Sequence, residues 1–278
     1  MSLDMLKQLK GPVVLVGAGK MGGALLDGWL GLGLDPANLV ALDPNLPDEV
    51  AAALAAKGVA ANPAYDTLPA AGVLVLAVKP QVAPAVIASV RALVGPETVV
   101  VSIMAGRTIG FLEKALTHRT AIIRTIPNTP AAIGQGITVA VANAAAPQVA
   151  RDAASALLGA VGPVEWVDNE DLMDVATAVS GSGPAYVFLL AEALAQAGAA
   201  AGLPADLADR LARATVSGAG ALLAQSGTAP GTLRQNVTSP GGTTAAALAV
   251  LMDASTGFGP LLTRAVADAT RRSHELAG

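Results

Sequence analysis

A glycine-rich segment near the start of the chain is the first place where residue types and their spacing indicate chemistry. Gly17, Gly19 and Gly22 follow the apolar run 13–16 and open a helical stretch that runs toward Gly33. Between a strand and a helix, such spacing permits a tight turn and the close approach of a pyrophosphate, which binds the exposed amides of the helix N-terminus. The segment predicts a dinucleotide site, and the alternative is a tight turn that binds nothing.

Asp43 stands 21 residues after Gly22, at the end of the second apolar run. An acidic side chain at this point accepts hydrogen bonds from the adenosine ribose of a bound dinucleotide and repels a 2′-phosphate. Asp43 therefore favours NADH over NADPH. The alternative is that Asp43, Pro44 and Asn45 form an ordinary turn.

Three further segments follow later apolar runs, at residues 77–81, 102–106 and 124–130. In open α/β sheets, ligands bind outside the carboxyl ends of the strands, so these segments are expected on the rim of the cofactor cleft. Lys79 stands at such an end and is either a cofactor contact or a solvated charge.

Residues 236–244, Asn-Val-Thr-Ser-Pro-Gly-Gly-Thr-Thr, carry the sharpest signal in the second half of the chain. Gly241 and Gly242 free the backbone before a helix that begins near Thr243, and the helix start offers unpaired amides and a positive dipole end. This arrangement predicts an anion cradle for a substrate that carries a carboxylate. The alternative is a Ser or Thr N-cap behind a flexible loop.

A second glycine break, residues 180–184, separates two helices of the second half. Ser182 is expected to cap a helix and Pro184 to occupy its first position, so this segment predicts close helix packing more than chemistry.

Six β-branched runs must position these segments, and they alternate with helical stretches at residues 13–16, 38–43, 73–78, 98–103, 121–126 and 137–141. Continuous apolar strands between helices are typical of a parallel sheet covered on both faces. The length of 278 residues exceeds one typical core. We predict a doubly wound, mainly parallel, Rossmann-like α/β domain over residues 1–163.

After a last apolar run at 164–167, the chain is predicted to be helical at residues 170–179, 185–201, 205–225, 243–252 and 260–276. Several of these helices are rich in alanine on more than one face, and a domain of about 115 residues cannot bury so many alone. We predict an all-α domain over residues 164–278 that forms a homodimer or a higher homo-oligomer. The most apolar stretch, 184–203, contains Glu192 and Gln196 and is expected to be a buried helix.

Composition excludes several classes of protein. A hydrophobic content of 53% with 14% charged residues argues against a disordered chain. The net charge of -4 gives no footprint for nucleic acid or a lipid surface. The chain has no cysteine, no visible export signal and only two histidines, His118 and His274, at no metal-ligand spacing. We expect a cytoplasmic protein with no metal, and we place His118 at a helix C-terminus.

Together, the motifs resemble the pyrroline-5-carboxylate reductase family. The similarity covers almost the whole chain and is carried by residues 17–22, 77–81, 124–130, 180–186 and, most diagnostic, 236–244. It implies a Rossmann domain followed by a helical domain that interlocks two subunits, with an active site shared between them. It also implies reduction of 1-pyrroline-5-carboxylate to L-proline, the last step of proline biosynthesis, by NADPH or NADH.

The resemblance also implies roles for individual residues. Thr244 bonds the ring nitrogen of the substrate as the catalytic residue, and Asn236 reaches the cofactor of the partner subunit. The implied substrate-binding residues are Ser239, Gly241, Gly242, Thr243 and Thr244. The implied cofactor-binding residues are Val16, Gly17, Ala18, Gly19, Lys20, Met21, Gly22, Asp43, Ala77, Val78, Lys79, Pro80, Ile103, Met104, Ala105 and Asn236.

Two positions depart from the family pattern. Members commonly carry Ser, Arg or Asn where Asp43 stands, and often Asn where Ala64 falls. Both departures weaken the expectation of a preference for NADPH.

A protonated imine needs a hydride donor and correct alignment more than it needs a strong base, and orientation alone can supply about 7 to 11 kcal/mol. One competing interpretation is a dehydrogenase of small hydroxy acids, but such enzymes carry a catalytic lysine in the second domain and residues 164–278 contain none. The other is a dinucleotide-sensing protein without catalytic activity.

Overall fold

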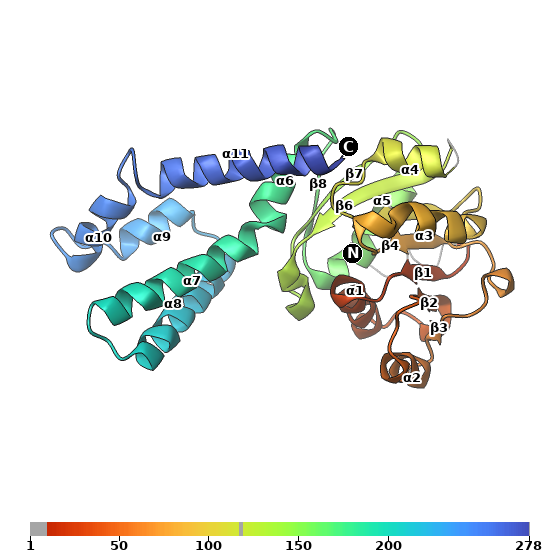
Figure 1. Cartoon of the computed structure of the whole chain (residues 1–278), viewed down its shortest axis with the longest axis horizontal. Coiled ribbons are helices and arrows are strands. Elements are labelled where there is room, and N and C mark those ends of the chain that lie inside the picture. Colours follow the sequence, from red (N-terminus) through yellow and green to blue (C-terminus); the bar gives the residue numbers. More distant parts are fainter. Residues whose placement is uncertain (1–9, 117–118, 278) are drawn as a thin grey trace. The chain divides into compact units, whose positions relative to one another are not determined.

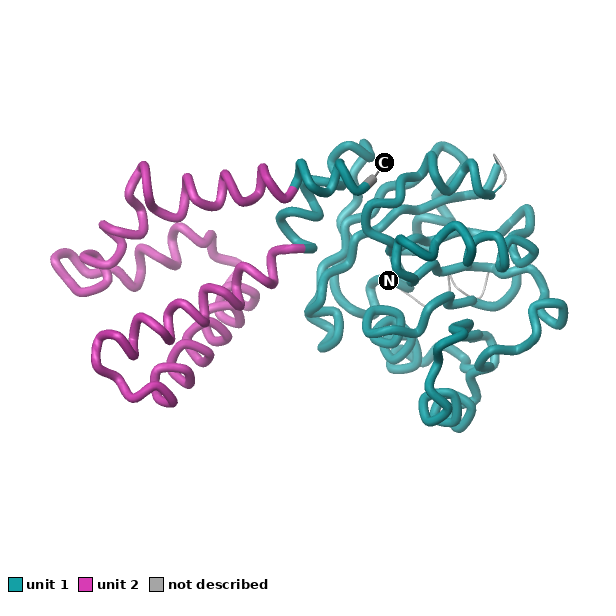
Figure 2. The backbone as a smooth tube through the Cα atoms, in the orientation of Figure 1, with its two compact units in different colours: residues 1–181, 270–278 teal, residues 182–269 magenta. Residues whose placement is uncertain are grey.

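A computed structural model of the chain describes residues 10–116 and 119–277 (Figure 1). The chain divides into two compact units, which are residues 1–181 with 270–278 (unit 1) and residues 182–269 (unit 2) (Figure 2). His118, which we expected at a helix C-terminus, lies outside the described residues.

Unit 1 is built on an eight-stranded sheet with the order β3-β2-β1-β4-β5-β6-β7-β8. All neighbouring strands are parallel except β6 and β7. The strands are β1 (Val13–Val16), β2 (Leu39–Leu42), β3 (Ala60–Ala61), β4 (Val73–Leu76), β5 (Val99–Ser102), β6 (Ala121–Pro127), β7 (Thr138–Ala142) and β8 (Val164–Trp166). The predicted Rossmann-like, mainly parallel sheet is confirmed, whereas β3 was not predicted because it is only two residues long.

Helices cover both faces of the sheet. They are α1 (Lys20–Gly31), α2 (Asp48–Ala56), α3 (Ala83–Val90), α4 (Ile109–Ala115), α5 (Gln148–Leu158) and α6 (Leu172–Ala176). Short 3-10 turns join them at η2 (Pro36–Asn38), η3 (Tyr65–Thr67), η4 (Pro80–Val82), η5 (Arg91–Leu93), η6 (Thr129–Ile133) and η7 (Gly159–Val161).

Successive residues of the strands alternate between two cores, as strand geometry requires. Leu15 of β1 packs in one cluster with Trp29 of α1 and Leu157 of α5. Val14 packs in the other cluster, with Ile87 of α3 and Leu112 of α4. Because both faces are covered, every residue of β1, β2, β4 and β5 is buried, which explains why these strands are continuous apolar runs.

The compact units divide after Gly181, whereas the sequence placed the domain boundary after Pro163. β8 pairs in parallel with β7, and Met173 of α6 is buried in a core cluster of the sheet. The change of pattern near Pro163 therefore marks the last strand of the sheet, and the chain leaves unit 1 only after the π-helical turn η8 (Thr177–Gly181).

Unit 2 is all helical, as predicted. Its helices are α7 (Gly183–Ala200), α8 (Ala205–Ser226), α9 (Pro230–Asn236), α10 (Thr243–Leu251) and α11 (Phe258–Ala277), and the last residues of α11 return to unit 1. The α7 and α8 helices form a hairpin through Gly202, whose φ of 108° suits glycine (Figure 1). The short helix α9 was not predicted.

The expectation that residues 184–203 form a buried helix is wrong for the single chain. No residue of α7 is buried, because α8 covers only part of its surface. Phe188 and Leu189 are 66% and 62% exposed. By length and composition, the stretch Leu172–Ala200 is apolar enough to cross a membrane, a test that core helices of soluble proteins also pass.

Candidate functional site

The turn between β1 and α1 requires its glycines. Gly17 has a φ of 98°, and a Cβ at this position would lie 2.6 Å from the carbonyl oxygen of Ala77. A Cβ on Gly22 would collide with the carbonyl oxygen of Gly17. Backbone hydrogen bonds fix the turn at the carboxyl end of β1, from Gly17 to Leu42 and from Ala77 to Val16, both at 2.8 Å.

The N-terminus of α1 is open to a ligand. Gly19 is the N-cap residue, no side chain caps the helix, and the first turn contains no acidic residue. A Cβ on Gly19 would meet no atom within 4 Å, so there is open space beside the N-cap residue. Open amides at a positive dipole end fit the pyrophosphate of a dinucleotide. Lys20, at the first helical position, is exposed.

Asp43 lies next to this turn, at the carboxyl end of β2. Its Oδ2 accepts a hydrogen bond from the Ala18 amide at 2.9 Å, and its Oδ1 accepts one from the Asn45 amide at 2.9 Å. The second contact is the turn that the sequence offered as the alternative, so the carboxylate makes this turn and also contacts the glycine-rich segment.

Asn62 holds the backbone of Asp43 on both sides. The Asp43 amide donates to Asn62 Oδ1, and Asn62 Nδ2 donates to the Asp43 carbonyl oxygen, each at 2.8 Å. Asn62 follows β3 in the left-handed region, with a φ of 48°, which asparagine tolerates better than most residues. The amide of Asn62 also donates to Ala41, so the ends of β2 and β3 are joined.

The loops after β4 and β5 are tied together by Arg107. Its Nε and Nη2 donate to the carbonyl oxygen of Pro80 at 3.1 and 2.7 Å, and its guanidinium lies 4.7 Å from the ring centroid of Phe111. Lys79 and Ala105 are exposed on these loops. Met104, by contrast, is buried in the core with 1% of its surface exposed, and Val16 is buried with 3% exposed. Both residues can therefore offer a cofactor only their backbone.

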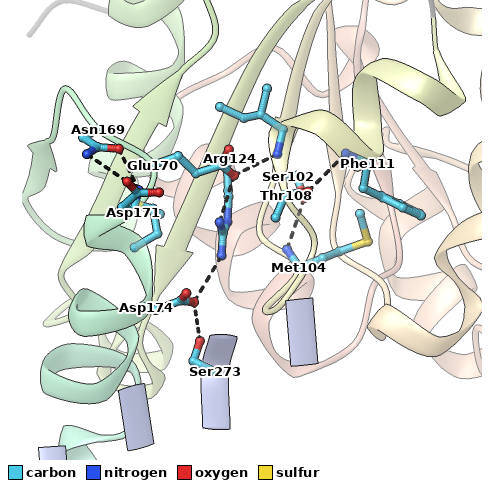
Figure 3. Close-up of polar contacts among 12 residues, drawn as sticks. Ser102, Met104, Thr108, Phe111, Arg124, Asn169, Glu170, Asp171, Asp174 and Ser273 are labelled. Atoms are coloured by element: carbon cyan, nitrogen blue, oxygen red, sulfur yellow. Dashed lines mark hydrogen bonds and ion pairs between the residues drawn. The ribbon is translucent and has the colours of Figure 1, made fainter. Parts of the chain in front are cut away.

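Arg124 is a buried arginine that joins the sheet to two segments of the chain, one that precedes unit 2 in the sequence and one that follows it. Arg124 of β6 is 2% exposed and lies 2.8 Å from Glu170 and 3.9 Å from Asp174 (Figure 3). Glu170 Oε1 also accepts from the Ile109 amide at 2.8 Å, and Asp174 accepts from Ser273 at 2.7 Å. This Arg124 cluster therefore connects strand β6, the start of α4, α6 and the end of α11, all within unit 1.

The predicted substrate loop in unit 2 is a turn followed by a helix start. The Gly242 amide donates to the carbonyl oxygen of Ser239 at 3.0 Å, and Gly241 has a φ of 70°. With Pro240 before it, this is the pattern of a type II turn, which needs glycine at its third position. Gly242 is the N-cap residue of α10, and neither Ser239 nor Thr243 caps the helix.

The first amides of α10 are consequently open. No hydrogen bond between described residues uses the amides of Thr243 or Thr244. The amide of Gly242, which we expected to bind the substrate, already closes the turn. The open amides of this loop therefore belong to the first residues of α10 rather than to Gly242.

The glycine break at residues 180–184 differs from its prediction. Ser182 makes no side-chain cap, although Pro184 does lie at the start of α7. The hydroxyl of Ser180 donates to the Ala176 carbonyl oxygen at 2.9 Å within the helical segment. The chain thus continues through η8 into α7 as one irregular helix.

The structure gathers the predicted cofactor residues from Val16 to Ala105 at the carboxyl ends of β1, β2, β4 and β5 in unit 1. Asn236, at the end of α9, and the loop of residues 239–244 belong to unit 2. Among the described residues, no three His, Cys, Asp or Glu side chains gather as ligands for a metal ion.

Sequence reasoning missed three residues that shape these sites, which are Asn62, Arg107 and Glu170. Each acts on a segment far along the chain, since Asn62 holds Asp43, Arg107 holds Pro80, and Glu170 binds Arg124. The one sequence signal was Asn62 itself, an asparagine that precedes a proline, but its partner could not be read from that pattern.

Two family models match the chain. The description of one is pyrroline-5-carboxylate reductase dimerisation, and it matches residues 170–276. The description of the other is NADP oxidoreductase coenzyme F420-dependent, and it matches residues 12–106.

Individual relatives extend this match over nearly the whole chain. A pyrroline-5-carboxylate reductase of Pseudomonas aeruginosa is 39% identical over 267 residues, covering 95% of this chain and 96% of the relative. One from Pisum sativum is 38% identical and covers 94% of each chain.

Solved structures agree with the sequence relatives. A pyrroline-5-carboxylate reductase from Coxiella burnetii has a TM-score of 0.89 at 32% identity and covers 96% of this chain and 99% of its own. One from Plasmodium falciparum, with NADP bound, has a TM-score of 0.80 at 28% identity and covers 97% and 99%. The resemblance drawn from the motifs is confirmed, and this chain belongs to the pyrroline-5-carboxylate reductase family.

Proposed function

We propose that the chain reduces 1-pyrroline-5-carboxylate to L-proline with hydride from NADH or NADPH, as the last step of proline biosynthesis. The observation that carries this proposal is the glycine-dependent turn at the carboxyl end of β1, with an open helix N-terminus, in a chain that matches the family end to end. When bound, the dinucleotide supplies the hydride, and an imine carbon accepts it.

The dinucleotide is held by the residues around β1, β2, β4 and β5. The amides at the start of α1 bind the pyrophosphate, and Asp43 faces the adenosine ribose. Lys79 and Ala105 stand exposed on the loops that Arg107 ties together, which supports a role for these loops in holding the nicotinamide half. The remaining cofactor contacts are the other cofactor-binding residues that the resemblance implied. Of these, Val16 and Met104 contribute their backbone.

The substrate carboxylate binds the loop of residues 239–244. The unclaimed amides of Thr243 and Thr244, at a positive helix end, support this role, with Ser239 and the two glycines shaping the approach. The hydroxyl of Thr244 holds the ring nitrogen, so that the imine carbon is presented for hydride transfer. Asn236 contacts the cofactor of the partner subunit.

The second half of the sequence shows no His, Cys or Lys constellation that could act as a strong base, which suits this chemistry. Residues 164–278 contain no lysine, which argues against the hydroxy-acid dehydrogenases that use a lysine in the second domain. A protonated imine needs alignment, and this chain supplies fixed backbone donors and one hydroxyl.

We assign cofactor binding and substrate binding to the two parts of the chain that the sequence pattern separates. Residues 1–163 bind the dinucleotide, and residues 164–278 bind substrate and form the homo-oligomer, which the dimerisation model over residues 170–276 supports. We further propose that the protein is cytoplasmic and binds neither nucleic acid nor a membrane.

The test is the oxidation of NADH and NADPH by the purified chain in the presence of 1-pyrroline-5-carboxylate, followed at the nicotinamide absorbance. We expect turnover that depends on the imine and yields L-proline. Binding of either dinucleotide without turnover, across the pH range in which the imine is partly protonated, would favour the dinucleotide sensor instead.

A further inference from the structure

We propose that this chain selects NADH over NADPH through the carboxylate of Asp43, and that Asn62 is the positioning residue that fixes it. The inference deepens the proposed function and rests on its use of a nicotinamide dinucleotide. It follows from the hydrogen bonds of Asp43, from the charges around it, and from the placement of the nearest cations in the sheet.

The carboxylate has a fixed position and spare capacity. Its two oxygens each accept one backbone hydrogen bond, from Ala18 and Asn45. An ionised carboxylate offers about four lone-pair sites, so both oxygens can still accept from ribose hydroxyls. Because Ala18 belongs to the glycine-rich segment, the carboxylate is held at the edge of the pyrophosphate cradle, where the adenosine ribose lies in this fold.

The charges around Asp43 oppose a 2′-phosphate. From residue 43 to residue 78, the chain contains four acidic residues, Asp43, Asp48, Glu49 and Asp66, and one basic residue, Lys57. Lys57 follows the C-terminal end of α2, and its Nζ lies 3.1 Å from Asp27. A 2′-phosphate of charge about −2 would therefore meet the Asp43 carboxylate, and the one basic residue of that segment is already paired with Asp27.

Three other basic residues of unit 1, Lys79, Arg107 and Lys20, stand on the segments that follow β4, β5 and β1. Lys79 follows β4, which is separated from β2 by β1 in the sheet order. Arg107 is committed to the carbonyl oxygen of Pro80 and the ring of Phe111. Lys20 stands at the start of α1, beside the pyrophosphate cradle.

Asn62 holds the backbone of Asp43 through the hydrogen bonds of its side chain. It satisfies both the amide and the carbonyl of Asp43, and β3, on which it depends, pairs with β2 only through Val40 with Ala60 and Ala41 with Ala61. Without the Asn62 side chain, the Asp43 amide loses its acceptor and the Asp43 carbonyl keeps only the Leu46 amide at 3.1 Å, so the backbone that carries the carboxylate is held less firmly toward a ribose.

The test is equilibrium binding of NADH and NADPH to the full-length chain, measured by nicotinamide fluorescence without substrate, together with kcat/KM for each dinucleotide. We expect NADH to bind at least about tenfold more tightly than NADPH. Asp43→Ser is expected to reduce that ratio to about one or below, because it removes the charge and keeps a hydroxyl acceptor. Asp66→Asn, which removes an acidic charge away from the Asp43 hydrogen bonds, is the matched control and should leave most of the ratio intact.

For Asn62 the variant is Asn62→Gly, because glycine tolerates the positive φ and any loss then reflects the missing side chain. We expect weaker NADH binding by about 3- to 10-fold with little change for NADPH, so the ratio falls while the unfolding midpoint changes little. Equal or tighter binding of NADPH to the parent chain, or an unchanged ratio in Asp43→Ser, would overturn the inference while leaving the reductase activity intact. If neither dinucleotide binds, the inference and the proposed function both fall.

Discussion

Thr244 is the second residue of α10, half-buried, beside amides that no described residue occupies. If its hydroxyl holds the ring nitrogen, Thr244→Val should lower kcat with 1-pyrroline-5-carboxylate by about 10- to 100-fold, since the variant keeps the shape but not the hydrogen bond. The Kd for the dinucleotide should be unchanged. Thr244→Ser, which keeps the hydroxyl, is the control, and an unaltered kcat in the valine variant would remove Thr244 from the mechanism.

Two adjacent glycines of α1 give a second test at the residue scale. A Cβ on Gly22 would strike the Gly17 carbonyl, whereas a Cβ on Gly23 would lie 3.8 Å from its nearest neighbour, the Ala18 carbonyl oxygen. Gly22→Ala should therefore destabilise the chain by about 1 to 3 kcal/mol and weaken dinucleotide binding. Gly23→Ala should stabilise it by about 0.5 to 1 kcal/mol. Urea unfolding with a dinucleotide titration checks both, and equal effects of the two variants would contradict the geometry.

At this scale, the sequence predicted residues whose role is local. The glycine spacing at 17–22 and the Pro-Gly-Gly of the loop before α10 dictate backbone geometry within a few positions, so both could be read directly. Asn62 and Arg107 could not, because each bonds a loop that only the folded sheet brings near. The turn that the Gly242 amide closes with Ser239 was not predicted, although neighbouring residues create it.

Among the elements, β6 depends on the Arg124 cluster. Replacing Arg124 with Met leaves Glu170 and Asp174 without their buried cation, so we expect a loss of about 2 to 4 kcal/mol in the free energy of unfolding. Lys10→Met is the control, because the pair of Lys10 with Glu97 is 78% and 64% exposed and should contribute little. Equal shifts of the urea midpoint in the two variants would show that the cluster does not support α6 and the end of α11.

Strands were predicted better than boundaries between elements. Seven apolar runs became strands because strands buried on both faces have no polar alternation to obscure them. The two-residue β3 and the short helix α9 were missed because neither is long enough to show a period. The boundary near Pro163 was placed at the end of β-branched runs, but packing of Met173 keeps α6 with the sheet.

For the whole molecule, unit 2 leaves many large hydrophobic side chains exposed, and the family match over residues 170–276 is to a dimerisation model. Phe188→Arg on α7 should therefore shift the protein toward monomer in analytical ultracentrifugation, because the charge would be buried at the subunit contact. Val149→Arg on α5 is the control, since Val149 is 42% exposed in unit 1. Retention of the parent's oligomeric state by the Phe188 variant would place the contact elsewhere.

The prediction of a homo-oligomer came from helices that are alanine-rich all round, and the structure explains why it could be made from sequence. The expectation that residues 184–203 form a buried helix does not hold for one chain, because no residue of α7 is buried. A sequence shows how much apolar surface must be covered, but it does not show which chain covers it.

The proposed reaction transfers hydride from the dinucleotide to the imine carbon of a carboxylate-bearing ring. The decisive experiment is the reaction of 1-pyrroline-5-carboxylate with NADH that carries deuterium at both positions of nicotinamide C4, followed by mass spectrometry of the product. We expect L-proline with one deuterium, on the ring carbon beside nitrogen that does not bear the carboxylate. Proline without deuterium at that carbon, or no proline at all, would contradict it.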